Sequence, residues 1–276
     1  MSISLLILTL NEETNLLACI ESLRWCDDIV VLDSFSTDRT LEIATSSGAR
    51  VIQRTFDNWA SHQNWAMENI SFKHEWVFYL DADERMTEEL RAEILSIANS
   101  AEGAEAAYYC GRKNFFMGRW IKHAMPPGMI MRFFKTKSIR FERLVNPTPV
   151  INGPHGYLKN CFLHYNFSKG LTEWFEKHNK YSTLEAQEGI KLLKGSTIPE
   201  GSLFTRDAAS RRKALKNLSF HLPGRTILKF FYLYVVKRGF LDGRPGLTYC
   251  ILQSIYEYMI AIKMKEIERK ERGLPI

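Results

Sequence analysis

Short apolar runs alternate with amphipathic stretches along the first hundred residues. Four of the runs have the apolar and β-branched content of buried strands: SLLILTL, DIVVLD, ARVIQRTF and EWVFYLDAD. The stretches between them have helical spacing, as in NEETNLLACIESLRWC, where Leu16, Leu17, Ile20 and Leu23 share one face. Strands that alternate with helices over short loops predict an α/β fold with a doubly wound, mostly parallel sheet.

Acidic side chains stand where two of these strands end. The second strand ends at Asp33, and the fourth runs into Asp81 and Asp83. Ligands of such sheets bind beyond the carboxyl ends of the strands. We therefore expect the three aspartates to lie along one rim of the sheet, joined there by the residues after the first strand, Thr9 to Glu12.

The pattern changes after residue 100. Residues 101–165 are basic and rich in short β-type runs, which predicts hairpins that complete the sheet and cover its ligand edge. Residues 171–194 are again helical in pattern, 196–204 resemble a linker, and the chain from 205 onward is basic and helical. The pattern predicts two domains, 1–195 around the sheet and 196–276 as a helical basic extension.

Charge is distributed unevenly along the 276 residues. Residues 1–100 hold 7 Lys/Arg and 17 Asp/Glu, a net charge of −10, whereas residues 101–202 (15 and 8) and 203–276 (15 and 6) carry +7 and +9. The hydrophobic content of 45% is enough for one large domain or one domain with an appended lobe, and a charged content of 25% argues against global disorder. A basic region predicts contact with phosphates, an anionic membrane surface or nucleic acid, unless it is simply a solvated face.

The cysteines and the apolar segments restrict the class of protein further. Five scattered cysteines without a CxxC pair argue against a disulfide framework and a zinc site, and they favour a reducing cytoplasm. The apolar start lacks a basic segment and soon meets Glu12 and Glu13, so we expect a strand and not a signal peptide. No segment reaches the roughly 20 apolar residues that span a bilayer.

The sequence Asp81-Ala82-Asp83, followed by Glu84, requires a positive partner because like charges at this spacing repel one another. One interpretation is that an acid caps the helix that begins near Thr87. The interpretation that we favour is a divalent cation, Mn²⁺ or Mg²⁺, held by these carboxylates and by the phosphates of a nucleotide. The cation would relieve the repulsion and neutralise a leaving diphosphate.

Other common nucleotide and hydrolase motifs are absent from the sequence. There is no GxGxxG after the first strand, no GxxxxGK[ST] and no GxSxG. Dinucleotide oxidoreduction and P-loop chemistry are therefore disfavoured.

The segment ILTLNEETNLLACIESLRWCDDIVVLDSFSTDRTLEIA, followed by WVFYLDADERM, resembles bacterial family 2 glycosyltransferases, nucleotide-sugar enzymes of the GT-A fold. The segments RKNFFMGRWI, HYNFS and VVKRGFLDGRPGL extend the resemblance to the lipopolysaccharide-core subgroup, which includes β-1,4-glucosyltransferases acting on inner-core heptose. The resemblance implies a metal-dependent enzyme that inverts the anomeric centre. It also implies a nucleotide-sugar donor, in particular a UDP-sugar, and a glycolipid or oligosaccharide acceptor.

The resemblance also implies roles for individual residues. Thr9, Asn11 and Glu12 would line the base and ribose, as would Asp33. Arg54 and Asn64 would make further nucleotide contacts. Asp83 would bind the metal directly, and Asp81 would contact either the metal or the ribose. Ala82 lies between them in the nucleotide-sugar site. His164 would approach the diphosphate or the metal, unless it is a structural histidine.

The sequence departs from the subgroup where a catalytic base is expected. The subgroup has an acid directly after a proline and a glutamate in a Val-His-Glu stretch, whereas this chain has Gly128 and Val145-Asn146-Pro147. Glu142 is the nearest remaining carboxylate and our candidate base, with a surface ion pair to Arg140 or Arg143 as the alternative. His155 is a second candidate.

The basic C-terminal region mixes cations with aromatic and aliphatic side chains. This pattern favours a helix lying on an anionic inner leaflet, which would place the enzyme at the cytoplasmic face of the cell membrane. Packing against the catalytic domain or in a homodimer contact explains the same pattern equally well and is compatible with membrane attachment. Nucleic acid is disfavoured because no nucleic-acid motif accompanies the charge.

Two other functions remain open from the sequence. One is a nucleotidyltransferase on a related sheet, although such enzymes carry a glycine-rich basic loop where this chain has TLNEETN. The other is a non-catalytic module that binds a nucleotide sugar or a membrane, which the acids missing at 128 and 147 favour.

Overall fold

A computed structural model of the chain describes residues 3–100, 105–142, 147–195 and 224–276. These residues belong to two compact units. Unit 1 comprises residues 1–115 and 126–168, and unit 2 comprises residues 116–125 and 169–276.

Unit 1 is built on a mixed, mostly parallel sheet with the strand order β3-β2-β1-β4-β8-β6-β11-β5. Strands β1 to β4 are parallel, whereas β8 is antiparallel to β4 and β6. The strands of this path are β1 (Ile3–Thr9), β2 (Ile29–Asp33), β3 (Arg50–Gln53), β4 (Trp76–Asp81), β5 (Glu84–Arg85), β6 (Ala107–Phe116), β8 (Met129–Lys135) and β11 (His155–His164). The predicted fold class is confirmed, and residues after 100 complete the sheet as expected.

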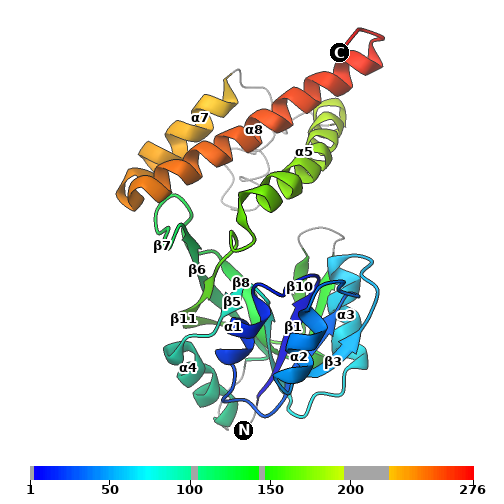
Figure 1. Cartoon of the computed structure of the whole chain (residues 1–276), viewed down its shortest axis with the longest axis vertical. Helices are drawn as coiled ribbons and strands as arrows, with labels where there is room; N and C mark the ends of the chain where they lie inside the picture. Colours follow the sequence, from blue (N-terminus) through cyan, green and yellow to red (C-terminus); the bar gives the residue numbers. More distant parts are fainter. Residues whose placement is uncertain (1–2, 101–104, 143–146, 196–223) are drawn as a thin grey trace. The chain divides into compact units, whose positions relative to one another are not determined.

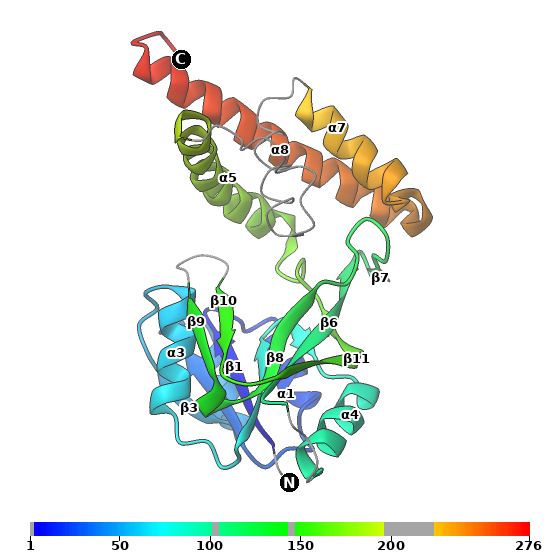
Figure 2. The same cartoon turned by 180° about the vertical axis from the view of Figure 1, so that it is seen from behind.

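Alternating side chains of the strands place a core on each face of the sheet. On β1, Ile3, Leu5 and Ile7 join one cluster, and Leu6 and Leu8 join the other. Helices α1 (Leu16–Glu21), α2 (Thr40–Ser46) and α4 (Glu88–Asn99) cover the first face, which Figure 1 presents. Helix α3 (Trp59–Asn69) and the small sheet of β9 (Ile139–Glu142) and β10 (Thr148–Ile151) cover the second, which Figure 2 presents.

Unit 2 is helical. It contains α5 (Gly170–Gly195), α7 (Arg225–Phe231), the π-helical turn η2 (Tyr232–Val236), the 3-10 turn η3 (Gly239–Asp242) and α8 (Gly243–Glu271), with the short strand β7 (Arg119–Trp120). Helix α5 packs on α8 through Ala186, Ile190, Ile260 and Met264. The division between the units therefore falls at residue 168, whereas the sequence pattern predicted a boundary at 195.

Two predictions from the sequence concern residues 196–223. The expected linker at 196–204 and the first part of the basic region, residues 205–223, lie outside the described residues. Among the helices that the structure describes, none combines the length and the apolar content needed to cross a bilayer.

A buried carboxylate explains why residues 116–125 belong to unit 2. Asp242 of η3 accepts hydrogen bonds from the backbone N–H groups of Lys122, His123 and Ala124, at 2.8–3.0 Å, and lies 2.8 Å from His123 Nδ1. A Cβ atom on Gly246 would collide with the carbonyl oxygen of Gly239, so the GFLDGRPG segment needs glycine there. This segment therefore anchors the 122–124 loop to the start of α8.

Candidate active site

Asp33 organises the turn that follows β2. Its carboxylate is fully buried and accepts hydrogen bonds from Thr9 Oγ1 (2.9 Å), the Ser36 backbone N–H (2.9 Å), Ser36 Oγ (2.5 Å) and Gln53 Nε2 (3.2 Å). Thr9 pairs with Asp33 in the parallel register of β1 and β2. The side chains of Thr9 and Asp33 therefore meet at the carboxyl edge, as the sequence predicts.

The loops after β1 and β2 are joined by hydrogen bonds from backbone N–H groups to side-chain oxygens. The Asn11 N–H donates to Ser36 Oγ (2.8 Å), and Asn11 Oδ1 accepts from the Thr37 N–H (2.8 Å). The Glu12 N–H donates to Thr40 Oγ1 at 2.7 Å. Asn11 has a positive φ of 54°, a conformation that asparagine tolerates better than most residues. These bonds fix the loop that carries the predicted nucleotide contacts Asn11 and Glu12.

Arg54 and Asn64 make local contacts on the α3 side of the sheet. Arg54 donates to both carboxylate oxygens of Asp57 (3.0 and 2.9 Å) and lies 2.9 Å from His62 Nδ1. Burial, together with Arg54, lowers the pKa of His62 to about 4, so that imidazole is neutral at pH 7. Asn64 exchanges two hydrogen bonds with the backbone of Phe141. The nucleotide contacts of Arg54 and Asn64 stay predictions.

A buried arginine lies against the first acid of the Asp81-Ala82-Asp83 sequence. Arg132 Nη2 donates to Asp81 Oδ2 at 2.6 Å and to Glu84 Oε1 at 2.7 Å. Its guanidinium also lies over the ring of Tyr79, 4.1 Å from the centroid, and the Tyr79 hydroxyl donates to Asp81 Oδ1 at 2.6 Å. The positive partner that the sequence requires is therefore, for Asp81 and Glu84, a side chain of β8.

Burial disfavours the charged forms of both Glu84 and Arg132. Burial raises the pKa of Glu84, and the guanidinium of Arg132 opposes that rise. Both oxygens of Glu84 accept hydrogen bonds, as an ionised carboxylate does. Burial alone would lower the pKa of Arg132, but the carboxylates of Asp81 and Glu84 hold it well above its ordinary value. Glu84 Oε2 accepts a further hydrogen bond from the Asp81 N–H at 2.9 Å. The arginine thus stays charged between two acids that repel each other.

Asp83 has a different neighbour. Its carboxylate oxygen Oδ2 lies 3.4 Å from His164 Nε2, and its side chain is 25% exposed. On the other side of the ring, His164 Nδ1 lies 2.7 Å from Asn114 Oδ1, and both His164 and Asn114 are buried. An amide oxygen only accepts hydrogen bonds, so Nδ1 carries a proton and Nε2 is directed at Asp83.

Backbone contacts hold the turn that carries Ala82 and Asp83. The Tyr165 N–H donates to the Asp83 carbonyl oxygen at 2.9 Å, and Arg85 Nη1 donates to the Ala82 carbonyl oxygen at 2.8 Å. Helix α4 is capped by Thr87, whose side chain accepts a hydrogen bond from the Leu90 N–H. The capping interpretation of Asp81 and Asp83 is therefore wrong.

The predicted site residues fall into separate groups. Asp33 accepts hydrogen bonds from Thr9, Ser36 and Gln53. Asp81 faces Arg132, and Asp83 faces His164. In the part of the chain that the structure describes, no three His, Cys, Asp or Glu side chains are grouped so as to hold a metal ion. Glu142 is exposed at the end of β9, and His155 is exposed at the start of β11. The roles of Glu142 and His155 as bases stay predictions.

Sequence reasoning assigned no role to Arg132, Tyr79 or Asn114. Arg132 stands alone within the apolar run MIMRFF, and a lone arginine in a buried strand is a recognisable sign of an internal ion pair. Its partner was not predictable locally, because β4 and β8 become neighbours only through the sheet order.

Comparison with known proteins identifies the family. The profile of Glycosyl transferase family 2 matches residues 4–163, which include all strands of the parallel half of the sheet. The chain belongs to glycosyl transferase family 2. It is therefore a glycosyltransferase that uses a nucleotide sugar, and this assignment favours the transferase hypothesis over the nucleotidyltransferase and the binding module.

Relatives of this glycosyltransferase align over almost its whole length. It is 29% identical over 270 residues to the lipopolysaccharide core biosynthesis glycosyltransferase LpsC of Rhizobium meliloti, covering 95% of this chain and 91% of LpsC. It is 25% identical to an uncharacterized glycosyltransferase of Rickettsia typhi, covering 99% and 89%. Among solved structures, S. aureus TarS is similar with a TM-score of 0.44 and 14% identity, covering 99% of this chain and 92% of that one.

We predict that Arg132→Met strongly destabilises this glycosyltransferase. The substitution leaves Asp81 and Glu84 without their buried positive partner, which costs about 3–5 kcal/mol of unfolding free energy. Urea denaturation followed by circular dichroism measures the loss.

The control is Arg140→Met, which removes an exposed arginine of β9 and is expected to change the unfolding free energy by less than about 0.5 kcal/mol. Adding Glu84→Gln to Arg132→Met is expected to recover part of the loss, because one buried negative charge disappears. Equal stabilities for Arg132→Met and Arg140→Met would contradict the ion-pair account.

Proposed function

We propose that this glycosyltransferase transfers a hexose from a UDP-sugar to a glycolipid acceptor of the lipopolysaccharide core type, with inversion at the anomeric carbon. The acceptor lies at the cytoplasmic face of the cell membrane. The observation that carries the proposal is the pair of Asp83 and His164, partly open to solvent at the carboxyl edge of a family 2 fold. The likeness to LpsC over 95% of the chain supports the acceptor class.

The donor atoms of this pair fit a divalent cation. Nε2 of His164 and the carboxylate of Asp83 face each other at 3.4 Å, and both groups are ligands for a divalent cation when the imidazole is neutral with its proton on Nδ1. Asn114 orients the imidazole from behind, in the manner of residues that support metal ligands. Mn²⁺ and Mg²⁺ often take one or two carboxylates and complete their coordination with substrate phosphates. When bound, such an ion neutralises the charge on the leaving diphosphate.

Asp81 has a different part in this proposal. Its bonds to Arg132 and Tyr79 fix the carboxylate, whose side chain remains 35% exposed at the rim. A fixed acceptor of this kind suits a ribose hydroxyl, which is one of the two roles expected from the sequence. The metal ligands of the protein are then Asp83 and His164.

The proposed reaction is a single displacement. The acceptor hydroxyl oxygen forms a bond to the anomeric carbon while the bond from that carbon to the diphosphate oxygen breaks, and the electron pair leaves with the diphosphate. The carboxylate of Glu142 takes the hydroxyl proton.

Transfer of radiolabel from UDP-sugars to a membrane extract tests the proposed function. UDP-glucose and UDP-galactose are each incubated with the enzyme, Mn²⁺ and lipid extract from a bacterium with a lipopolysaccharide core. Label in the extracted glycolipid is expected for one of the donors. Label in soluble oligosaccharide alone, or in no product, would contradict the proposed acceptor.

We predict that Asp83→Ala abolishes metal-dependent UDP binding and leaves the fold intact. Calorimetry with UDP, with and without Mn²⁺, measures the effect, and the loss of affinity in Mn²⁺ is expected to exceed about tenfold. The matched control is Glu68→Ala, an exposed acid on α3. Unchanged affinity of Asp83→Ala in Mn²⁺ would remove Asp83 from the metal site.

We predict that Glu142→Gln lowers turnover by about 10²- to 10⁴-fold, the range for loss of a general base, with little change in UDP affinity. Arg140→Gln is the control, because Arg140 and Glu142 are both exposed on β9. A rate near that of the wild type would exclude Glu142 as the base and leave His155 as the remaining candidate.

A further inference from the structure

Unit 2 exposes apolar side chains on two adjacent helices. On α8, Ile251, Ile255, Tyr258 and Ile262 are exposed at intervals of four, three and four residues, which places them in one stripe along the helix. On α7 and η2, the exposed apolar side chains are Ile227, Leu228, Phe231, Tyr232, Val235 and Val236. We name these two sets together the α7–α8 face.

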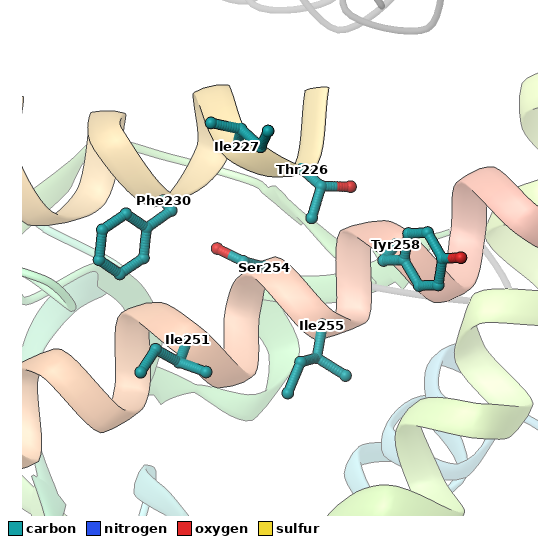
Figure 3. Close-up of a pocket in the computed structure, with 7 residues that line it drawn as sticks. All are labelled: Thr226, Ile227, Phe230, Ile251, Ser254, Ile255 and Tyr258. Atoms are coloured by element: carbon teal, nitrogen blue, oxygen red, sulfur yellow. The ribbon is translucent and has the colours of Figure 1, made fainter. Parts of the chain in front are cut away.

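A groove runs between the two helices of this face. Figure 3 shows Ile227 and Phe230 of α7 lining it with Ile251, Ile255 and Tyr258 of α8, and its volume is about 360 Å³. Ion pairs from Arg225 and Lys229 to Glu257 hold α7 against α8. The groove is therefore a fixed apolar feature of the surface. Exposed apolar side chains that gather at one place on a surface favour a contact site.

The segment that carries the α7–α8 face is basic. Residues 224–262 contain five Arg/Lys and two acids. Both acids are engaged internally, since Asp242 binds the 122–124 loop and Glu257 pairs with Arg225 and Lys229. Lys237, Arg238 and Arg244 are exposed, and Lys237 lies over the ring of Tyr232 on the face. A partner of this face must combine apolar material with negative charge.

We infer that the α7–α8 face docks on an anionic lipid bilayer, with its apolar side chains in the interfacial region and Lys237, Arg238 and Arg244 at the lipid headgroups. Helices with an apolar face bordered by cations bind such surfaces. A second copy of the chain fits less well, because a twofold contact through one face brings the same cations together. The inference deepens the proposed function, since a glycolipid acceptor lies in a membrane.

Vesicle sedimentation of the full chain tests the inference without any donor or acceptor, so its outcome is independent of the transferase proposal. The probes are vesicles of phosphatidylcholine alone and vesicles with about one third phosphatidylglycerol. Binding is expected to the anionic vesicles and to fall at high salt, because the ionic contribution is screened. Equal binding to both vesicle types, or to neither, would overturn the inference.

The test variant is Ile227→Asp with Val236→Asp, at two of the most exposed apolar positions of the face, which are 62% and 67% exposed. The matched control is Leu171→Asp with Leu184→Asp on α5, where both leucines are also exposed. The test variant is expected to lose at least about tenfold in affinity for anionic vesicles, and the control less than twofold. Lys237→Gln alone is expected to lose about fivefold, the contribution of one cation at an anionic surface.

Two measurements on the lipid-free protein test whether a second copy or another segment of the chain covers the α7–α8 face. If a second copy covers it, sedimentation velocity shows a dimer that the test variant dissociates. If another segment of the chain covers it, the two aspartates are buried and the thermal midpoint of the test variant falls by several degrees below that of the control. Either result would overturn the inference, which predicts a monomer and equal midpoints.

Discussion

The acids at the carboxyl edge of the sheet depend on one interaction, the ion pair of the buried Arg132 guanidinium with Asp81 and Glu84. The guanidinium donates to Asp81 and Glu84 at 2.6 and 2.7 Å, close to a face of the sheet where two carboxylates would otherwise repel each other. Removing either partner of such a pair is costly, because it leaves a charge in a medium that solvates it poorly. Acids are therefore tolerated at the end of β4 because Arg132 of the neighbouring strand β8 lies beside them.

This arrangement gives the three acids different partners. Glu84 and Asp81 are neutralised from within the protein, whereas Asp83 is left facing His164 at the partly exposed rim. Asn114 and the Tyr165 N–H fix the two sides of that pair, so its geometry is set before any ligand arrives. The division explains how a chain can end a buried strand on several acids, and in the proposed function it leaves Asp83 to bind a divalent cation.

The parallel half of the fold was predictable because its information is local. Short apolar runs predicted β1 to β4, and the ends of these runs predicted the shared position of Thr9 and Asp33. The partner of Asp81 was not predictable, because it depends on β8 lying next to β4, a pairing between residues about fifty positions apart. The packing of α5 on α8 is likewise a long-range contact, which explains why the units divide at 168 and not at the change of composition near 195.

Anomalous diffraction from crystals grown with UDP and Mn²⁺ tests the central claim most directly. The account predicts one manganese peak about 2 Å from an oxygen of Asp83 and from Nε2 of His164, with the ion pair of Arg132 to Asp81 and Glu84 still in place. A peak bound by Asp33, or one bound by Asp81 and Glu84 after Arg132 has moved away, would contradict it.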